Sequence, residues 1–147
     1  RRIDHAGERE MEAEPVLRDA DPLAQPGGHH PPAGRALQAA ERLAAEHGIL
    51  AEVIDLRSLR PLDRETLLSS VRKTGKCLVV YEDNRFGGFG AEVAALVAEE
   101  AFDYLDGPVT RLAGPDSPAS PNALPLEEAF MLSPTKIAAA IRTLAAY

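Results

Sequence analysis

The sequence predicts an α/β fold with three layers, α/β/α, built around a mostly parallel sheet. Three observations predict it. From residue 34 onward, helix-type and strand-type patterns alternate along the chain. The run CLVVYE, Cys77 to Glu82, is apolar at five consecutive positions, which is typical of a strand covered on both faces. Finally, 147 residues of which 45% are apolar suffice for one hydrophobic core.

The first helix and strand are expected at residues 35–47 and 49–56. Leu37, Ala40 and Ala44 recur at helical spacing, and Gly48 follows where a left-handed cap costs least. The next run, ILAEVIDL, is short and contains β-branched residues, which favours a strand.

The second helix begins after Asp63, whose carboxylate can accept a hydrogen bond from the Thr66 backbone N–H. Leu67, Leu68 and Val71 give it an apolar face, and the helix should stop at Gly75. The apolar run 77–82 then forms the second strand.

A third helix is expected at about 88–105, ended by Gly107 and Pro108, and a short strand follows at 109–112. Ser133 caps the last helix, with Pro134 in its first turn, where the missing N–H has no cost. The connection before it is rich in proline, at Pro115, Pro118, Pro121 and Pro125. Because strands and helices alternate, right-handed crossovers should place helices on both faces of the sheet.

Residues 1–33 differ from the rest and are expected to be disordered, so that the folded domain covers 34–147. The first 34 residues contain five of the twelve prolines and only five Val, Ile, Leu, Met or Phe residues. The helix at 35–47 should be preceded by a strand, but ADPLAQPGGHHPPAG cannot provide one because proline has no N–H for a ladder. We therefore expect the sheet to lack its first strand.

Charge and composition exclude several classes of function. The net charge is −7 and the pI is about 5.1, which argues against nucleic acid as a partner and is compatible with a basic protein partner. No apolar run reaches the ~18 residues of a membrane span, and the first residues do not resemble a secretory signal. Cys77 is the only cysteine, which agrees with a cytoplasmic location.

A glycine-rich turn, YEDNRFGGFG, joins the strand at 77–82 to the following helix. Gly87, Gly88 and Gly90 could let the backbone approach an anion at the helix N-terminus. They could equally make a tight turn and allow close packing of helix on sheet. Neither the dinucleotide fingerprint nor a phosphate-binding loop with its lysine is present, so both interpretations remain open.

No catalytic, cofactor-binding or metal-binding residues can be assigned from the sequence. Glu82 and Asp83 are adjacent on a strand and should point to opposite faces. His29 and His30 have no further ligand at suitable spacing. Cys77 lies in an apolar strand, and His47 lies at a helix end without a nucleophile nearby. The sequence therefore indicates a module without its own catalytic centre.

Four segments resemble one known family, the C-terminal domain of transketolase-like proteins. They are AEVIDLRSLRPLD (51–63), VVYEDNRFGGFGAEVAA (79–95), AFDYLDGPVTRLAGPD (101–116) and LPLEEAF (124–130). The resemblance covers residues 34–147 and is closest to the β subunit of the thiamine-diphosphate-dependent 2-oxoacid dehydrogenases, of pyruvate or branched-chain type. The EDN…GGFG form favours the branched-chain type.

The resemblance implies an assembly function within a multienzyme complex. In this family the C-terminal domain contacts a second β subunit and offers a docking surface for the basic subunit-binding domain of the dihydrolipoyl acyltransferase. It implies Asp103, Asp106 and the Tyr147 carboxylate as docking candidates. Thiamine diphosphate is held in the complete enzyme between the α subunit and an N-terminal domain of the β subunit that has no counterpart here. This chain alone is therefore expected to bind no cofactor and to be inactive.

The departure from the family lies upstream, where its members have an apolar strand in place of the Pro/Gly/His segment. We interpret residues 1–33 as the remnant of a truncated or frame-shifted gene. Two other functions remain open: a free-standing α/β domain that binds a small anion or nucleotide, and a dimerisation domain of a transketolase-type enzyme.

Overall fold

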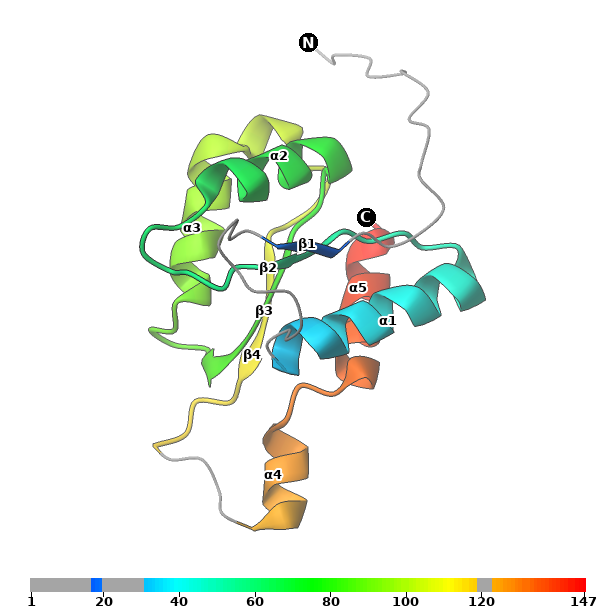
Figure 1. Ribbon diagram of the computed structural model, residues 1–147, viewed down its shortest axis with the longest axis vertical. Helices are drawn as coiled ribbons and strands as arrows, with labels where there is room; N and C mark the ends of the chain where they lie inside the picture. The colour runs from blue at the N-terminus through cyan, green and yellow to red at the C-terminus, as the bar shows by residue number, and fades with distance from the viewer. Residues whose placement is uncertain (1–16, 20–30, 119–122) are drawn as a thin grey trace.

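The computed structural model describes residues 17–19, 31–118 and 123–147. Strands and helices alternate along most of the chain, which confirms the predicted α/β class (Figure 1). The elements are β1 (Leu17–Asp19), α1 (Pro31–His47), β2 (Val53–Asp55), α2 (Arg64–Thr74), β3 (Leu78–Asn84), α3 (Gly90–Glu100), the 3₁₀-helix η1 (Phe102–Tyr104), β4 (Thr110–Gly114), α4 (Leu124–Phe130) and α5 (Pro134–Ala145). Among the described residues, no helix is long and apolar enough to cross a membrane.

Strands β3 and β4 form the centre of the molecule. They are parallel, and Leu78 pairs with Thr110 at one end and Tyr81 with Ala113 further along. Successive strand side chains point to opposite faces. Val79 therefore packs against α2 and α3, and Val80 packs against α1 and α5. The two helix pairs lie on opposite sides of the strands, so the expected three layers are present (Figure 1).

Each face of the sheet has its own apolar cluster. The cluster on the α1 and α5 side joins Ala39, Leu43, Ile137 and Ala138. The cluster on the α2 and α3 side consists of Leu67, Leu68, Val71, Cys77, Val79, Val93, Val97 and Ala101. Burial of these side chains supplies the main favourable free energy of folding.

The predicted helix ends are confirmed at three sites. Asp63 Oδ1 accepts a hydrogen bond from the Thr66 backbone N–H at 3.0 Å, and this contact lowers the pKa of the Asp63 carboxyl. Gly75 ends α2 with φ at 71°, in the left-handed region that glycine adopts without strain. Ser133 Oγ accepts from the Lys136 N–H at 3.3 Å, and Pro134 lies in the first turn of α5.

The expectation of a missing first strand is wrong. Residues Leu17–Asp19 form β1, which pairs in parallel with β2, Leu17 opposite Val53 and Asp19 opposite Asp55. These three residues end before the first proline of the 20–34 segment, so the proline objection does not apply to them. The β1–β2 pair and the β3–β4 pair are separate two-stranded sheets. The expected disorder of residues 1–16 and 20–30 falls outside the described residues.

Several boundaries also differ from the sequence-based expectation. Helix α1 starts at Pro31, because Pro31 and Pro32 lie in the first turn, where a proline needs no N–H. The third helix is shorter than expected, since α3 ends at Glu100 and η1 continues as a 3₁₀ turn. The proline pattern places Pro125 in the connection, whereas the structure has it in the first turn of α4. Strand β2 is only three residues long.

Candidate functional site

The predicted docking residues lie at the amino ends of β3 and β4. The segment after α3 turns back there, because the Asp106 backbone N–H donates to the Gly75 carbonyl oxygen at 2.7 Å, just before β3 begins. We call Phe102, Asp103, Tyr104, Asp106 and Tyr147 the amino-edge surface. All five side chains are exposed.

The end of the chain packs onto this segment. A Cβ atom placed on Gly107 would lie 3.1 Å from the Cβ of Tyr147, so the two residues are in contact. Lys76 lies just before β3, and its Nζ donates to the Ala145 carbonyl oxygen at 3.4 Å. The structure therefore brings Asp103, Asp106 and Tyr147 to one surface, although Tyr147 lies about 40 positions after the two aspartates.

Aromatic and acidic side chains alternate on the amino-edge surface. Phe102 and Tyr147 are each 71% exposed, and Tyr104 is 50% exposed. The Arg72 guanidinium lies over the Tyr104 ring, 5.6 Å from its centroid, and helps to hold it. Asp103 and Asp106 have no ion pair with any other residue the structure describes. Such a surface suits a partner with basic and apolar side chains.

A cavity of about 600 Å³ adjoins this surface. Most of its wall is apolar, and Asp103 contributes the carboxylate; the other lining residues are Ala98, Phe102, Leu105, Gly107, Pro108 and Val109. An apolar side chain of a partner could enter it beside the acidic groups.

The glycine-rich turn is explained largely by packing. A Cβ atom on Gly90 would lie 2.6 Å from Tyr81 Cζ, and one on Gly88 would lie 2.7 Å from Tyr81 Cε2. Gly87 has φ at 75°, which permits the turn itself. Of the two interpretations left open, the geometry supports close packing on Tyr81 for Gly88 and Gly90.

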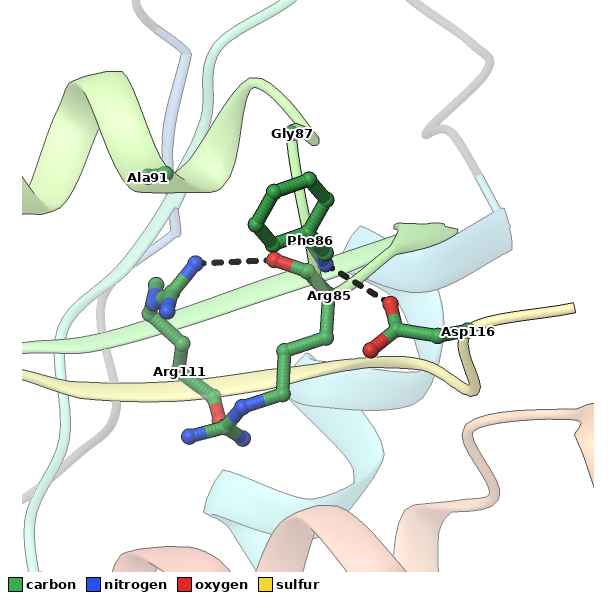
Figure 2. A pocket seen from close by; sticks show the side chains of 6 residues that line it. All are labelled: Arg85, Phe86, Gly87, Ala91, Arg111 and Asp116. Carbon is green, nitrogen blue, oxygen red and sulfur yellow. Dashed lines mark hydrogen bonds between the residues drawn. The ribbon is translucent and has the colours of Figure 1, made fainter.

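A second cavity, of about 340 Å³, lies at the carboxyl ends of β3 and β4 (Figure 2). We call it the carboxyl-edge cavity; it is lined by Arg85, Phe86, Gly87, Ala91, Arg111 and Asp116. Arg85 Nη1 donates to the Arg111 carbonyl oxygen at 3.1 Å, and Arg111 Nη1 donates to the Arg85 carbonyl oxygen at 3.0 Å. The sequence did not reveal this arginine pair, because nothing local links residues 26 positions apart.

The residues considered for catalysis are not brought together. Glu82 pairs with Arg35, with Oε1 and Nη1 2.6 Å apart, and Asp83 Oδ1 accepts the Asn84 backbone N–H at 2.7 Å. Burial raises the pKa of the Cys77 thiol to about 11, so it is a poor nucleophile. His47 is exposed at the end of α1. His29 and His30 lie outside the described residues.

Comparisons with known proteins assign the chain to one family. Residues 32–137 match the family described as transketolase, C-terminal domain. The chain is 50% identical over 112 residues to the 2-oxoisovalerate dehydrogenase subunit beta of Bacillus subtilis, which covers 76% of this chain and 34% of the relative. It is 50% identical over 101 residues to the mitochondrial pyruvate dehydrogenase E1 component subunit beta of Dictyostelium discoideum, covering 69% and 28%.

A solved structure gives the same fold. It is described as a split gene transketolase in an inactive beta4 tetramer, with a TM-score of 0.67 and 28% sequence identity. The similarity covers 91% of this chain and 40% of that one. The chain thus spans about a third of the length of the curated relatives and less than half of the solved structure.

Proposed function

Because the chain belongs to the transketolase C-terminal domain family, we propose that it is the C-terminal assembly domain of a 2-oxoacid dehydrogenase β subunit. The complete enzyme would be the decarboxylating component for a branched-chain 2-oxoacid or for pyruvate. Its relatives at 50% identity carry those two names, whereas the transketolase structure is 28% identical, which favours the dehydrogenase over a transketolase-type enzyme.

The amino-edge surface is the proposed docking site for the dihydrolipoyl acyltransferase. The observation that carries this proposal is the convergence of Asp103, Asp106 and Tyr147 on one exposed surface beside an apolar cavity. A basic subunit-binding domain would place Lys or Arg against the two carboxylates and an apolar side chain in the cavity. Complementary charge chiefly sets the association rate and the choice of partner.

Contact with a second β subunit is the other part of the proposed assembly function. Leu126 of α4 is 56% exposed and Met131, at its end, is 44% exposed. Helix α4 lies apart from the two helix pairs in Figure 1, so these apolar side chains are available to another chain. The similar solved structure is named as a tetramer of beta chains, which supports self-association of such a domain. We also propose an α subunit as a partner of the complete enzyme.

Thiamine diphosphate is proposed to bind elsewhere in the complete enzyme. Its diphosphate requires a divalent metal ion held by carboxylate or similar ligands. Within residues 17–19, 31–118 and 123–147, no three His, Cys, Asp or Glu side chains are grouped to hold such an ion. We therefore propose no contact between this cofactor and the described residues.

The docking proposal can be tested by capture of the purified chain on an immobilised subunit-binding domain of a dihydrolipoyl acyltransferase. Asp103→Asn, Asp106→Asn and the double variant should weaken capture, and the loss should shrink as salt concentration rises. Each lost charge contact should cost up to about tenfold in affinity. Glu41→Gln, which removes one exposed carboxylate on α1, is the matched control and should bind like the wild type.

Two results would contradict the docking proposal. One is equal capture of the double variant and the wild type at low salt. The other is an equal loss in Glu41→Gln, which would mean that net charge alone governs binding. Sedimentation of the wild type and Leu126→Glu tests the β contact separately, since the substitution should shift any dimer toward monomer.

A further inference from the structure

Arg85 and Arg111 differ from four other arginines of the chain in their charge partners. Four other arginines, Arg35, Arg42, Arg57 and Arg64, each lie within 4 Å of a carboxylate oxygen. Neither Arg85 nor Arg111 has an ion pair in the part of the chain that the structure describes. In a chain with a net charge of −7, it is a distinctive feature that two guanidinium groups and a single carboxylate, that of Asp116, line the same cavity.

The two side chains are held in place by neutral oxygens. Each guanidinium donates to the backbone carbonyl of the other residue, at 3.1 and 3.0 Å, and Arg111 Nη1 also donates to Tyr81 Oη at 3.2 Å. An arginine has five N–H donors, so these contacts leave most of them unused among the described residues. Figure 2 shows both side chains at the wall of the carboxyl-edge cavity. Donors fixed in this way lose little conformational entropy when they bind a ligand.

The first turn of α3 adds to the positive potential. Ala91 lines the cavity, and its backbone N–H donates to the Gly88 carbonyl oxygen at 3.0 Å, so the helix end acts through its dipole. The N-terminal end of an 11-residue helix favours an anion. Two acids oppose this: Asp116, whose Oδ1 already accepts the Phe86 N–H at 2.7 Å, and Glu92 in the first turn of α3.

We infer that the carboxyl-edge cavity is a binding site for a phosphate group, either free phosphate or a small phosphate monoester. Arg85 and Arg111 each bring to the cavity wall a guanidinium group that could donate to a phosphate oxygen, and a cavity of about 340 Å³ has room for a small ligand. The two nearby carboxylates make the binding weak and reversible. This site is distinct from the amino-edge surface, so its failure would leave the docking proposal intact.

The test is an NMR titration of the full chain with potassium phosphate, glycerol 3-phosphate, and potassium chloride at matched ionic strength. Saturable shifts of the Gly87, Gly88 and Ala91 amides are expected with one or both phosphates and not with chloride. Saturation by inorganic phosphate indicates a free-phosphate site, and tighter binding of the ester indicates a phosphorylated metabolite.

Variants then identify the groups responsible. Arg85→Gln and Arg111→Gln should each lower phosphate affinity by about tenfold or more, the effect expected for losing a charge-assisted hydrogen bond. Arg142→Gln removes an exposed arginine from α5 and should leave the affinity unchanged. Arg85 is exposed, so its variant should remain folded even if Arg111→Gln does not.

The inference is overturned by an absence of saturable shifts in the wild type, or by an unchanged affinity in Arg85→Gln. It is also overturned if an aspartate-rich peptide binds the cavity and phosphate does not, because the surface would then recognise an acidic protein segment.

Discussion

The same substitution, Gly→Ala, should have opposite effects at two helix starts. Gly34 lies in the first turn of α1, where an added Cβ would meet nothing within 4 Å. Gly34→Ala should therefore raise the free energy of unfolding by about 0.5–1 kcal/mol, the difference in helix propensity. At Gly90 an added Cβ would lie 2.6 Å from Tyr81 Cζ and closer still to two other ring carbons.

The ring of Tyr81 cannot easily move away, because its hydroxyl accepts from Arg111 Nη1 at 3.2 Å. Overpacking of this kind costs about 1–3 kcal/mol, which exceeds the gain in helix propensity. Gly90→Ala should thus lower the free energy of unfolding by about 1–2 kcal/mol.

Urea denaturation followed by circular dichroism measures both values. A double-mutant cycle with Tyr81→Ala supplies the control, since removal of the ring should abolish the cost of Gly90→Ala. The packing explanation of the turn is refuted if Gly90→Ala stabilises the protein as Gly34→Ala does, or if its cost persists without the Tyr81 ring.

Four further predictions test the core, a helix cap, the cysteine and the proposed function. Leu43 is 2% exposed, so Leu43→Ala should lower the free energy of unfolding, measured by urea denaturation, by about 2–5 kcal/mol. Leu59 is 52% exposed, so Leu59→Ala should lower it by only about 0.5 kcal/mol. Equal losses would contradict the assigned core. Because the pKa of Asp63 is lowered in the folded protein, its cap stabilises the protein above the unfolded pKa of about 4, and this stabilisation is lost as the pH falls through the folded pKa. Asp63→Ala should therefore have a lower melting temperature than the wild type at neutral pH. Its melting temperature should also change less than that of the wild type on acidification. Cys77, with its pKa raised to about 11, should resist iodoacetamide at about pH 8 until urea unfolds the chain; rapid labelling of the folded protein would refute its burial. The chain given thiamine diphosphate alone should not decarboxylate pyruvate or branched 2-oxoacids, and measurable turnover would refute the absence of a catalytic centre.

The sequence predicted those features whose cause is local. The cap of Asp63, the left-handed Gly75 and the proline of α5 each depend on groups within a few residues, and all three are confirmed. The apolar run around Val79 and Val80 likewise predicted a strand covered on both faces, because every position of that run is apolar.

Features that depend on distant partners could not be predicted. Strand β1 has only three residues, and pairing with β2, 36 positions away, defines it as a strand. The Arg85 and Arg111 pair and the contact of Tyr147 with Gly107 arise in the same way, from neighbours brought together by the fold. The prolines before α4 suggested a loop because proline both breaks helices and begins them.

Three of the helices in the described residues, α1, α4 and α5, have proline in the first turn. The residue directly before a proline is biased away from helical geometry, so a proline in the first turn opposes extension of a helix toward its N-terminus. Insertions or deletions upstream of them should therefore leave their register unchanged. Homologous proteins can be expected to vary in length at these three junctions while the packed helices keep a constant size.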